Sequence, residues 1–322
     1  MEKYAFCRPI EAELQLFEDE FRAVLTSDVS LINDVAVHLA MHRGKRLRPI
    51  LAFLTCGLHG AAPQAALKPA LAVELLHTAT LVHDDVVDSS LLRRGAPTVN
   101  GLWSNRIAIL VGDLLFSRAL ATLLDGGDVP ALRLLSDATF RMSRGELLQE
   151  EQGSDYHAME QNYFRVVSDK TAALLSACCQ LGAMAAGAGD ESLRTMDQFG
   201  EHLGIAFQIR DDILDYVGDQ ETLGKPIGSD ILNNKITLPL LHALRNAEPP
   251  VAQEIMAHVQ SGEKERVEMV IAFVRQHGGL AYSTAQVERY LRQADSCLEA
   301  YAPSPYKQAL QELLRYVGAR EK

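Results

Sequence analysis

The stretch from Ala131 to Lys225 contains none of the chain's twelve prolines. Proline interrupts a helix because it lacks a backbone N–H and clashes with the preceding turn, so this stretch leaves room for long helices. Apolar residues recur at three- and four-residue spacing in "PALRLLSDATFRMSRGELLQEEQ", "DKTAALLSACCQLGAMAAGA" and "ESLRTMDQFGEHLGIAFQIRDDILDYVGD". That spacing predicts amphipathic helices, and no segment shows the alternation of a convincing β-strand.

The helical spacing continues on the N-terminal side. "KPALAVELLHTATLVHDDVVD" predicts a helix that begins just after Pro69, and "SNRIAILVGDLLFSRALATLLD" predicts one with Ser104 as its N-cap. Short segments rich in Gly, Pro and Asn separate the helices, and no linker or low-complexity run divides the chain. We therefore expect one all-α domain over residues 1–322, with about ten or more helices and Ala- and Leu-rich ones at the centre.

Composition excludes several classes of protein. The formal net charge of −11 argues against a nucleic-acid-binding surface. Five scattered cysteines without a C-x-x-C pair suit a reducing compartment and no zinc site. The N-terminus lacks the pattern of a signal peptide, and no window approaches 18 uninterrupted apolar residues. We expect a cytoplasmic protein with no transmembrane segment and no nucleic-acid partner.

Two clusters of aspartates end apolar segments. They share the spacing D-D-x-x-D and consist of Asp84, Asp85 and Asp88 in "LVHDDVVDSS", and of Asp211, Asp212 and Asp215 in "IRDDILDY". Residues four apart on a helix lie about 40° from each other, so the outer aspartates of each cluster share a face. Such like charges destabilise a helix. A solvated helix tip would explain one cluster, whereas two predict cations between facing helices. Carboxylates without His or Cys suit Mg²⁺, which also takes waters and phosphate oxygens.

Basic residues gather in a few short segments of this acidic chain: "HRGKRLRP", "LLRRG", "SDKTAA" and "LGKPIGSDILNNK". Each alone is compatible with an ordinary surface, and "GKPIGS" lacks the spacing of a phosphate-binding P-loop. Together with the aspartates they indicate two anionic ligands, one held through metal ions and one held by Arg and Lys side chains.

These segments resemble, in order and rough spacing, the motifs of trans-isoprenyl diphosphate synthases. The match consists of "GKRLRP", "HDDVVD" followed by "RRG", "GELLQ", "DKTA", "FQIRDDILD" and "GKPIGSD" with "TLP", and it runs from Gly44 to Pro239. The resemblance implies the class I isoprenoid synthase fold, a large helical bundle around a central substrate cavity, as a homodimer. It also implies a prenyltransferase that adds isopentenyl diphosphate head-to-tail to an allylic diphosphate such as farnesyl or geranylgeranyl diphosphate.

The resemblance also implies roles for single residues. Up to three Mg²⁺ ions, which Mn²⁺ can replace, would be bound by Asp84, Asp85, Asp88, Asp211, Asp212 and Asp215. The allylic diphosphate would be contacted by Arg93, Lys170, Thr171, Gln208, Lys225 and Lys235. Isopentenyl diphosphate would be held without metal by Lys45, Arg48, His77 and Arg94. The catalytic set is Asp84, Asp85, Asp88, Asp211, Asp212 and Lys170. The released diphosphate would take the final proton. Asn234 stands where the family usually has glycine before the last lysine, and the C-terminal "GAREK" is given no role.

Product length depends on residues below the first cluster. Ala72, Leu76, Ala79 and His83 form one stripe of the predicted helix. Short-chain members of the family typically carry an aromatic residue at the position of Ala79 or Thr80, and both are small here. We therefore expect a long-chain synthase of the octaprenyl type, with about seven to ten isoprene units for a quinone side chain and transient membrane contact for product release. Close helix packing would also explain Ala72 and Ala79, and hydrogen bonding on a helix face would also explain His77 and His83.

Three other functions are compatible with parts of this sequence. A terpene cyclase typically replaces the second aspartate cluster and has no need of "GKRLRP". A non-catalytic partner subunit tends to lose aspartates that are all present here. A purely structural, cation-binding helical bundle would be separated from a synthase by one assay with labelled isopentenyl diphosphate and an allylic primer.

Overall fold

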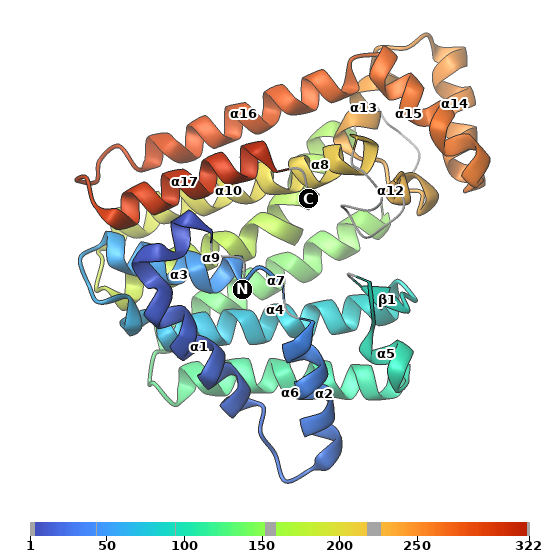
Figure 1. Cartoon of the computed structure of the whole chain (residues 1–322). Coiled ribbons are helices and arrows are strands. Elements are labelled where there is room, and N and C mark those ends of the chain that lie inside the picture. Colours follow the sequence, from blue (N-terminus) through green and yellow to red (C-terminus); the bar gives the residue numbers. More distant parts are fainter. Residues whose placement is uncertain (1–3, 43, 94, 152–158, 218–226, 321–322) are drawn as a thin grey trace. The chain divides into compact units, whose positions relative to one another are not determined.

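The structure is a computed structural model that describes residues 4–42, 44–93, 95–151, 159–217 and 227–320 (Figure 1). The chain forms two compact units, which are described separately. The first comprises Met1–Ala138, Leu174–Gln198 and Leu298–Glu312, and the second comprises Thr139–Ala173, Phe199–Cys297 and Leu313–Lys322. That residues 1–322 form a single domain stays a prediction.

Nearly all regular structure in the described part of the chain is helical. Up to residue 151 the elements are η1 (Ala5–Ile10), α1 (Glu11–Val24), α2 (Ser30–Met41), α3 (Leu47–Leu58), η2 (Pro63–Ala66), α4 (Leu67–Val87), β1 (Leu92–Arg93), β2 (Ala96–Pro97), α5 (Val99–Leu102), α6 (Asn105–Leu124) and α7 (Val129–Glu151). The later elements are α8 (Met159–Val167), the π-helical turn η3 (Ser168–Ala172), α9 (Ala173–Ala185), α10 (Asp190–Val217), α12 (Ser229–Leu232), α13 (Leu238–Arg245), α14 (Pro249–Ser261), α15 (Lys264–Gln276), α16 (Gly279–Cys297) and α17 (Pro305–Ala319).

The first unit is built around α4, which lies along α6 and also packs against α3 (Figure 1). Helices α4 and α6 approach closely because α6 carries Gly112 opposite His83 of α4. A Cβ atom at Gly112 would lie 2.1 Å from His83 Nε2, so no larger residue fits there without a shift. Phe17, Phe21 and Phe53 are fully buried and contact one another through their rings. Arg46, which pairs with Glu74 of α4, lies over the rings of Phe17 and Phe21, so this interior packs beside the middle of α4.

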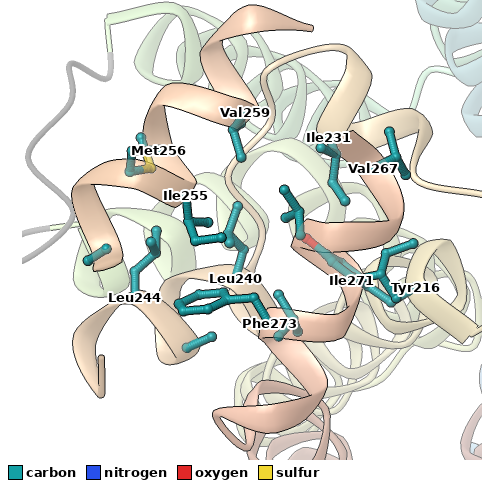
Figure 2. Packing of buried hydrophobic residues seen from close by; sticks show 14 residues of the cluster. Tyr216, Ile231, Leu240, Leu244, Ile255, Met256, Val259, Val267, Ile271 and Phe273 are labelled. Atoms are coloured by element: carbon teal, nitrogen blue, oxygen red, sulfur yellow. The ribbon is translucent and has the colours of Figure 1, made fainter. Parts of the chain in front are cut away.

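The second unit has an apolar cluster between α13, α14 and α15 (Figure 2). Leu240, Leu244, Ile255 and Phe273 meet at its centre. Tyr216, near the end of α10, reaches the same cluster, and its hydroxyl lies 3.1 Å from Thr237 Oγ1. The packing therefore anchors the end of α10, which carries the second aspartate cluster.

The all-α prediction is confirmed. The predicted N-cap is also correct, because Ser104 Oγ accepts a hydrogen bond from the Ile107 N–H at 3.3 Å. The predicted start of α4 after Pro69 is wrong. The helix begins at Leu67, since proline is tolerated in a first turn, where its missing N–H has no intrahelical acceptor. The hairpin of β1 and β2 was not predicted, because strands of two residues are too short to show alternation.

Two described segments are long and apolar enough to cross a membrane by length and composition alone: Pro63–Val87 and Asn105–Leu124. Of the first window 61% is buried inside the protein. Only 33% of the second window is buried. Helix α6 therefore presents apolar side chains on its surface, among them Ile109, Leu110 and Phe116.

Candidate active site

The first aspartate cluster occupies the C-terminal end of α4. Asp84 is half-buried, Asp85 is buried and Asp88 is exposed at the C-cap position. Asp85 Oδ1 accepts a hydrogen bond from Arg93 Nε at 2.7 Å. The hairpin that carries Arg93 thus contacts the cluster directly, and the structure brings a predicted metal ligand together with a predicted diphosphate ligand. Arg94 lies outside the described residues.

The basic segment before α3 contains residues with different surroundings. Lys45 is exposed, whereas Arg46 is buried and adopts a left-handed backbone conformation with φ of 56°. The Arg46 guanidinium contacts Glu18 Oε1 at 3.1 Å and Glu74 Oε1 at 2.7 Å. Arg46 therefore links α1 to α4 and serves the fold.

Arg48 has a different environment. Its Nε atom is buried and makes no hydrogen bond among the described residues. Burial lowers the pKa of Arg48, and the nearby Glu74 acts in the opposite direction. A buried guanidinium nitrogen without an acceptor is available to an anionic ligand. His77, the other described residue predicted to hold isopentenyl diphosphate, is half-buried on α4.

The second aspartate cluster is bound into the second unit by all three of its members. Asp212 Oδ2 accepts a hydrogen bond from the Tyr163 hydroxyl at 2.6 Å, and its Oδ1 accepts one from Gln208 Nε2 at 2.9 Å. Asp211 forms an ion pair with Arg320 near the C-terminus. Asp215 is fully buried; its Oδ1 accepts from Ser229 Oγ and its Oδ2 from the Asp230 N–H, both at 3.0 Å.

The charge around Asp212 is strongly negative. Burial raises the pKa of Asp212 to about 8, and the carboxylates of Asp230 and then Asp211 add to the shift, whereas the hydrogen bonds from Tyr163 and Gln208 oppose it. A cation beside these carboxylates would offset the cost of burying them. The donor set of the second cluster therefore fits a hard divalent ion.

The π-helical turn η3 presents Lys170 and Thr171. Lys170 Nζ lies 2.8 Å from Glu146 Oε2 and 3.2 Å from Gln149 Oε1, both on α7. The Thr171 hydroxyl donates to Gln208 Oε1 on α10 at 2.9 Å. Such π-turns are frequent at functional sites. This one carries two predicted substrate ligands, Lys170 and Thr171, and Thr171 contacts a third, Gln208.

Asp169 holds the same turn against α7. It is buried, and its carboxylate accepts hydrogen bonds from Arg141 Nε at 3.0 Å and Arg144 Nε at 2.8 Å. Helix α7 approaches the turn closely at Gly145, where a Cβ atom would lie 2.7 Å from the Lys170 backbone nitrogen. This close approach explains why the "GELLQ" motif has glycine, and no larger residue, at position 145.

Lys235 follows a tight turn after α12. Its N–H donates to the Asp230 carbonyl at 2.8 Å, and Asn234 before it has φ of 56°. Asparagine adopts this left-handed conformation more readily than most residues. Asn234 can therefore form the same turn as the glycine that the family usually has at this position. Lys225 lies outside the described residues.

The predicted chain-length residues lie on the buried part of α4. Ala72, Leu76 and Ala79 are buried, and Thr80 is half-buried with its hydroxyl donating to the His77 carbonyl at 2.9 Å. His83, on the same stripe, faces α6, where its Nε2 lies 3.2 Å from the Ile109 carbonyl oxygen. The role of these residues in product length stays a prediction.

The described carboxylates do not form a ready-made metal cage. Within the described ranges, no group of three or more His, Cys, Asp or Glu side chains is arranged to hold an ion. Magnesium usually takes only one or two protein carboxylates and completes its shell with waters and phosphate oxygens. The carboxylates present therefore fit Mg²⁺ that binds together with a diphosphate.

Some residues of this site were not predicted from the sequence. Tyr163, Asp169 and Arg320 contact predicted ligands or hold the turn that carries them. Asp169 directly precedes Lys170 and Thr171, so its position in the sequence was a signal that it could hold the segment that carries them. Tyr163 and Arg320 carry no local signal, because their partners lie 49 and 109 residues away in the sequence.

Comparison with known proteins places the chain in a family. The polyprenyl synthetase family profile matches residues 29–275. The chain is 36% identical to heptaprenyl diphosphate synthase component 2 of Geobacillus stearothermophilus, over 96% of each chain. It is also 36% identical to octaprenyl diphosphate synthase of Escherichia coli K12, over 92% of this chain and 93% of that one. A polyprenyl synthase from Caulobacter crescentus CB15, solved with calcium and isoprenyl diphosphate, superposes with a TM-score of 0.93 at 34% identity, over 99% of this chain and 98% of that one. This chain belongs to the polyprenyl synthetase family.

Proposed function

We propose that the chain is a trans-prenyltransferase that condenses isopentenyl diphosphate head-to-tail with an allylic diphosphate. The product would be a long-chain all-trans polyprenyl diphosphate, such as the precursor of a quinone side chain. The observation that carries the proposal is the pair of aspartate clusters, each ending a buried helix with a predicted diphosphate ligand in contact: Arg93 with Asp85, and Gln208 with Asp212. Relatives at 36% identity bear the names of heptaprenyl and octaprenyl diphosphate synthases.

The allylic diphosphate would be held by cationic and polar side chains as its C–O bond breaks. The family resemblance assigns hydrogen bonds to the departing group to Arg93, Lys170, Thr171, Gln208, Lys225 and Lys235. When bound, Mg²⁺ would neutralise the negative charge that develops there. The buried apolar residues of α4, Ala79 and Val82 among them, would keep water from the allylic carbocation.

Isopentenyl diphosphate would be held without metal. The exposed Lys45 and the buried, unpaired Nε of Arg48 support this assignment, together with His77 and Arg94. The double bond of this substrate attacks the allylic carbon, and the released diphosphate accepts the proton that is lost. The chain therefore needs no side chain as the general base.

The proposed Mg²⁺ ligands are Asp84, Asp85, Asp88, Asp211 and Asp212, for up to three ions that Mn²⁺ can replace. Asp215 was included in the sequence prediction. It stays a proposed ligand, because a carboxylate oxygen that accepts a hydrogen bond can still bind a cation. Asp215 also holds α12 against the end of α10, since its two oxygens accept hydrogen bonds from Ser229 and Asp230 in the first turn of α12.

A homodimer is also part of the proposal. The exposed face of α6 carries Ile109, Leu110, Phe116 and Leu124, which are 45%, 55%, 37% and 54% exposed. An apolar face of this kind is typical of a surface that another protein covers, and we propose a second copy of this chain. The proposal places the enzyme in the cytoplasm, with transient membrane contact when the long product leaves.

The test is the metal-dependent consumption of isopentenyl diphosphate with an allylic primer. Asp84→Ala and Asp211→Ala should each lower turnover by several orders of magnitude, because charge on the leaving group is no longer neutralised. Asp137→Ala, at an exposed position of α7, is the control and should retain activity. Circular dichroism should show unchanged helix content in all three. Near wild-type turnover in either cluster variant would contradict the proposal.

A further inference from the structure

Tyr163 of α8 is a buried tyrosine whose hydroxyl meets a carboxylate of the second aspartate cluster. The ring packs in an apolar cluster with Val167, Ile209 and Ile213. Its hydroxyl donates to Asp212 Oδ2 at 2.6 Å. A tyrosine hydroxyl carries its proton at neutral pH and acts as a hydrogen-bond donor to a carboxylate.

The opposite oxygen of Asp212 is held from the other side. Gln208 Nε2 donates to Asp212 Oδ1 at 2.9 Å, and Gln208 Oε1 accepts from the Thr171 hydroxyl at 2.9 Å. Because an ionised carboxylate only accepts hydrogen bonds, Asp212 requires the Nε2 end of the Gln208 amide, which leaves Oε1 to accept from Thr171. One continuous chain of hydrogen bonds thus runs from Thr171 through Gln208 and Asp212 to Tyr163. All four residues belong to the second unit.

Two donors on opposite oxygens fix the plane of a carboxylate. Each carboxylate oxygen has two lone pairs, so it can accept a hydrogen bond and still bind a cation. Residues that orient a metal ligand in this way typically change metal affinity or activity by about 10- to 100-fold when they are removed. Gln208 is already a predicted substrate ligand, whereas nothing so far gives Tyr163 a role beyond packing.

We propose that Tyr163 is a positioning residue that orients the Asp212 carboxylate toward a divalent cation. The inference rests on the proposed function in one respect, namely that Asp212 is a metal ligand. The structure offers a clean way to separate the hydroxyl from the ring, because Tyr163→Phe keeps the packing and removes only the donor. Tyr216 is a matched control, since it is also a buried tyrosine of the same unit but its hydroxyl pairs with Thr237 Oγ1.

The experiment measures Mn²⁺ binding to the full chain by the electron paramagnetic resonance of free Mn²⁺, with inorganic diphosphate present. Tyr163→Phe should weaken Mn²⁺ binding about 10- to 100-fold, and Tyr216→Phe should leave it unchanged. The Mg²⁺ concentration needed for half-maximal turnover should rise in the same proportion, while the KM for isopentenyl diphosphate stays constant. Wild-type Mn²⁺ affinity in Tyr163→Phe, or an equal loss in Tyr216→Phe, would overturn the inference.

Asp212→Asn separates this inference from the proposed function. If Asp212→Asn binds Mn²⁺ as the wild type does, Asp212 is not a metal ligand. That result would contradict both the positioning role of Tyr163 and the metal site of the proposed function. If Asp212→Asn weakens binding but Tyr163→Phe does not, only the positioning role falls. In the double variant, Tyr163→Phe should cause no further loss, because the carboxylate it orients is gone. A full additional loss there would show that Tyr163 acts independently of Asp212 and would also overturn the inference.

Discussion

Asn234 shows how a departure from a family pattern can be neutral for the backbone. Its φ of 56° is in the left-handed region, where glycine is favoured, and the turn is closed by the Lys235 N–H on the Asp230 carbonyl at 2.8 Å. Asparagine tolerates this region better than other residues with a Cβ atom. The turn that places Lys235 therefore does not require glycine.

Substitution at Asn234 should follow backbone preference. Asn234→Gly should change the free energy of unfolding by less than about 0.5 kcal/mol. Asn234→Ala should lower it by roughly 1 kcal/mol, because alanine is disfavoured at positive φ. Urea denaturation followed by circular dichroism measures both. Equal stability of the glycine and alanine variants would contradict the conformation described for this turn.

Neighbouring residues of one motif can have unrelated tasks. Lys45, Arg46 and Arg48 are equivalent by residue type, yet Arg46 is buried between Glu18 and Glu74 while Lys45 is exposed. The sequence predicted which residue types gather here. It could not predict the burial of Arg46, because both glutamates lie 28 residues away on other helices.

At the level of elements, the π-helical turn η3 depends on a charged network. Asp169 is buried and binds Arg141 and Arg144 of α7, and Arg141 also contacts Glu201 of α10 at 2.5 Å. These contacts hold the turn whose next two residues are Lys170 and Thr171. The turn is therefore positioned by both α7 and α10.

Asp169→Asn should displace that turn. Losing charge-assisted hydrogen bonds should lower the free energy of unfolding by roughly 1.5–3 kcal/mol. The KM for the allylic diphosphate should rise about tenfold, and the KM for isopentenyl diphosphate should stay constant. Arg144→Ala is the control with a smaller effect, since Arg144 is 52% exposed. The measurement is steady-state kinetics with each substrate varied in turn. An equal rise of both KM values would contradict a role of Asp169 in positioning the turn.

Helix α4 carries the prediction on product length. Ala79→Tyr should yield mainly fifteen- or twenty-carbon products, because a tyrosine at this buried position would close the path below the aspartates. Ala79→Ser keeps the residue small and should leave the products long. Chromatography of the products, with helix content checked by circular dichroism, measures both. Long products from Ala79→Tyr would mean that the chain grows along another face.

The sequence predicted the helices well because their apolar spacing is a local property. The bounds of α7 and α10 and the N-cap Ser104 needed no tertiary information. The π-helical turn was not predicted, since "DKTAALLSACCQ" has the same spacing as an ordinary helix. The turn is held by the contact of Asp169 with Arg141, 28 residues away in the sequence, which no local pattern contains.

At the level of the whole molecule, the two substrates should be separable by mutation. Lys45→Ala and Arg48→Ala should raise the KM for isopentenyl diphosphate, and Arg93→Ala and Lys170→Ala should raise that for the allylic substrate. A lost charge-assisted hydrogen bond costs roughly 1.5–3 kcal/mol, or about ten- to a hundredfold in KM. Initial-rate kinetics measures the four variants. A rise in KM for the same substrate in all four variants would contradict the assignment of two separate anion sites.

The most direct test of the account is the chain length of the product. Purified protein is incubated with Mg²⁺, farnesyl diphosphate and labelled isopentenyl diphosphate, and the dephosphorylated products are separated by chromatography. The account predicts labelled all-trans polyprenols of about seven to ten isoprene units, absent when the metal is chelated. No incorporation of label, or a cyclised hydrocarbon in place of a linear polyprenol, would contradict it.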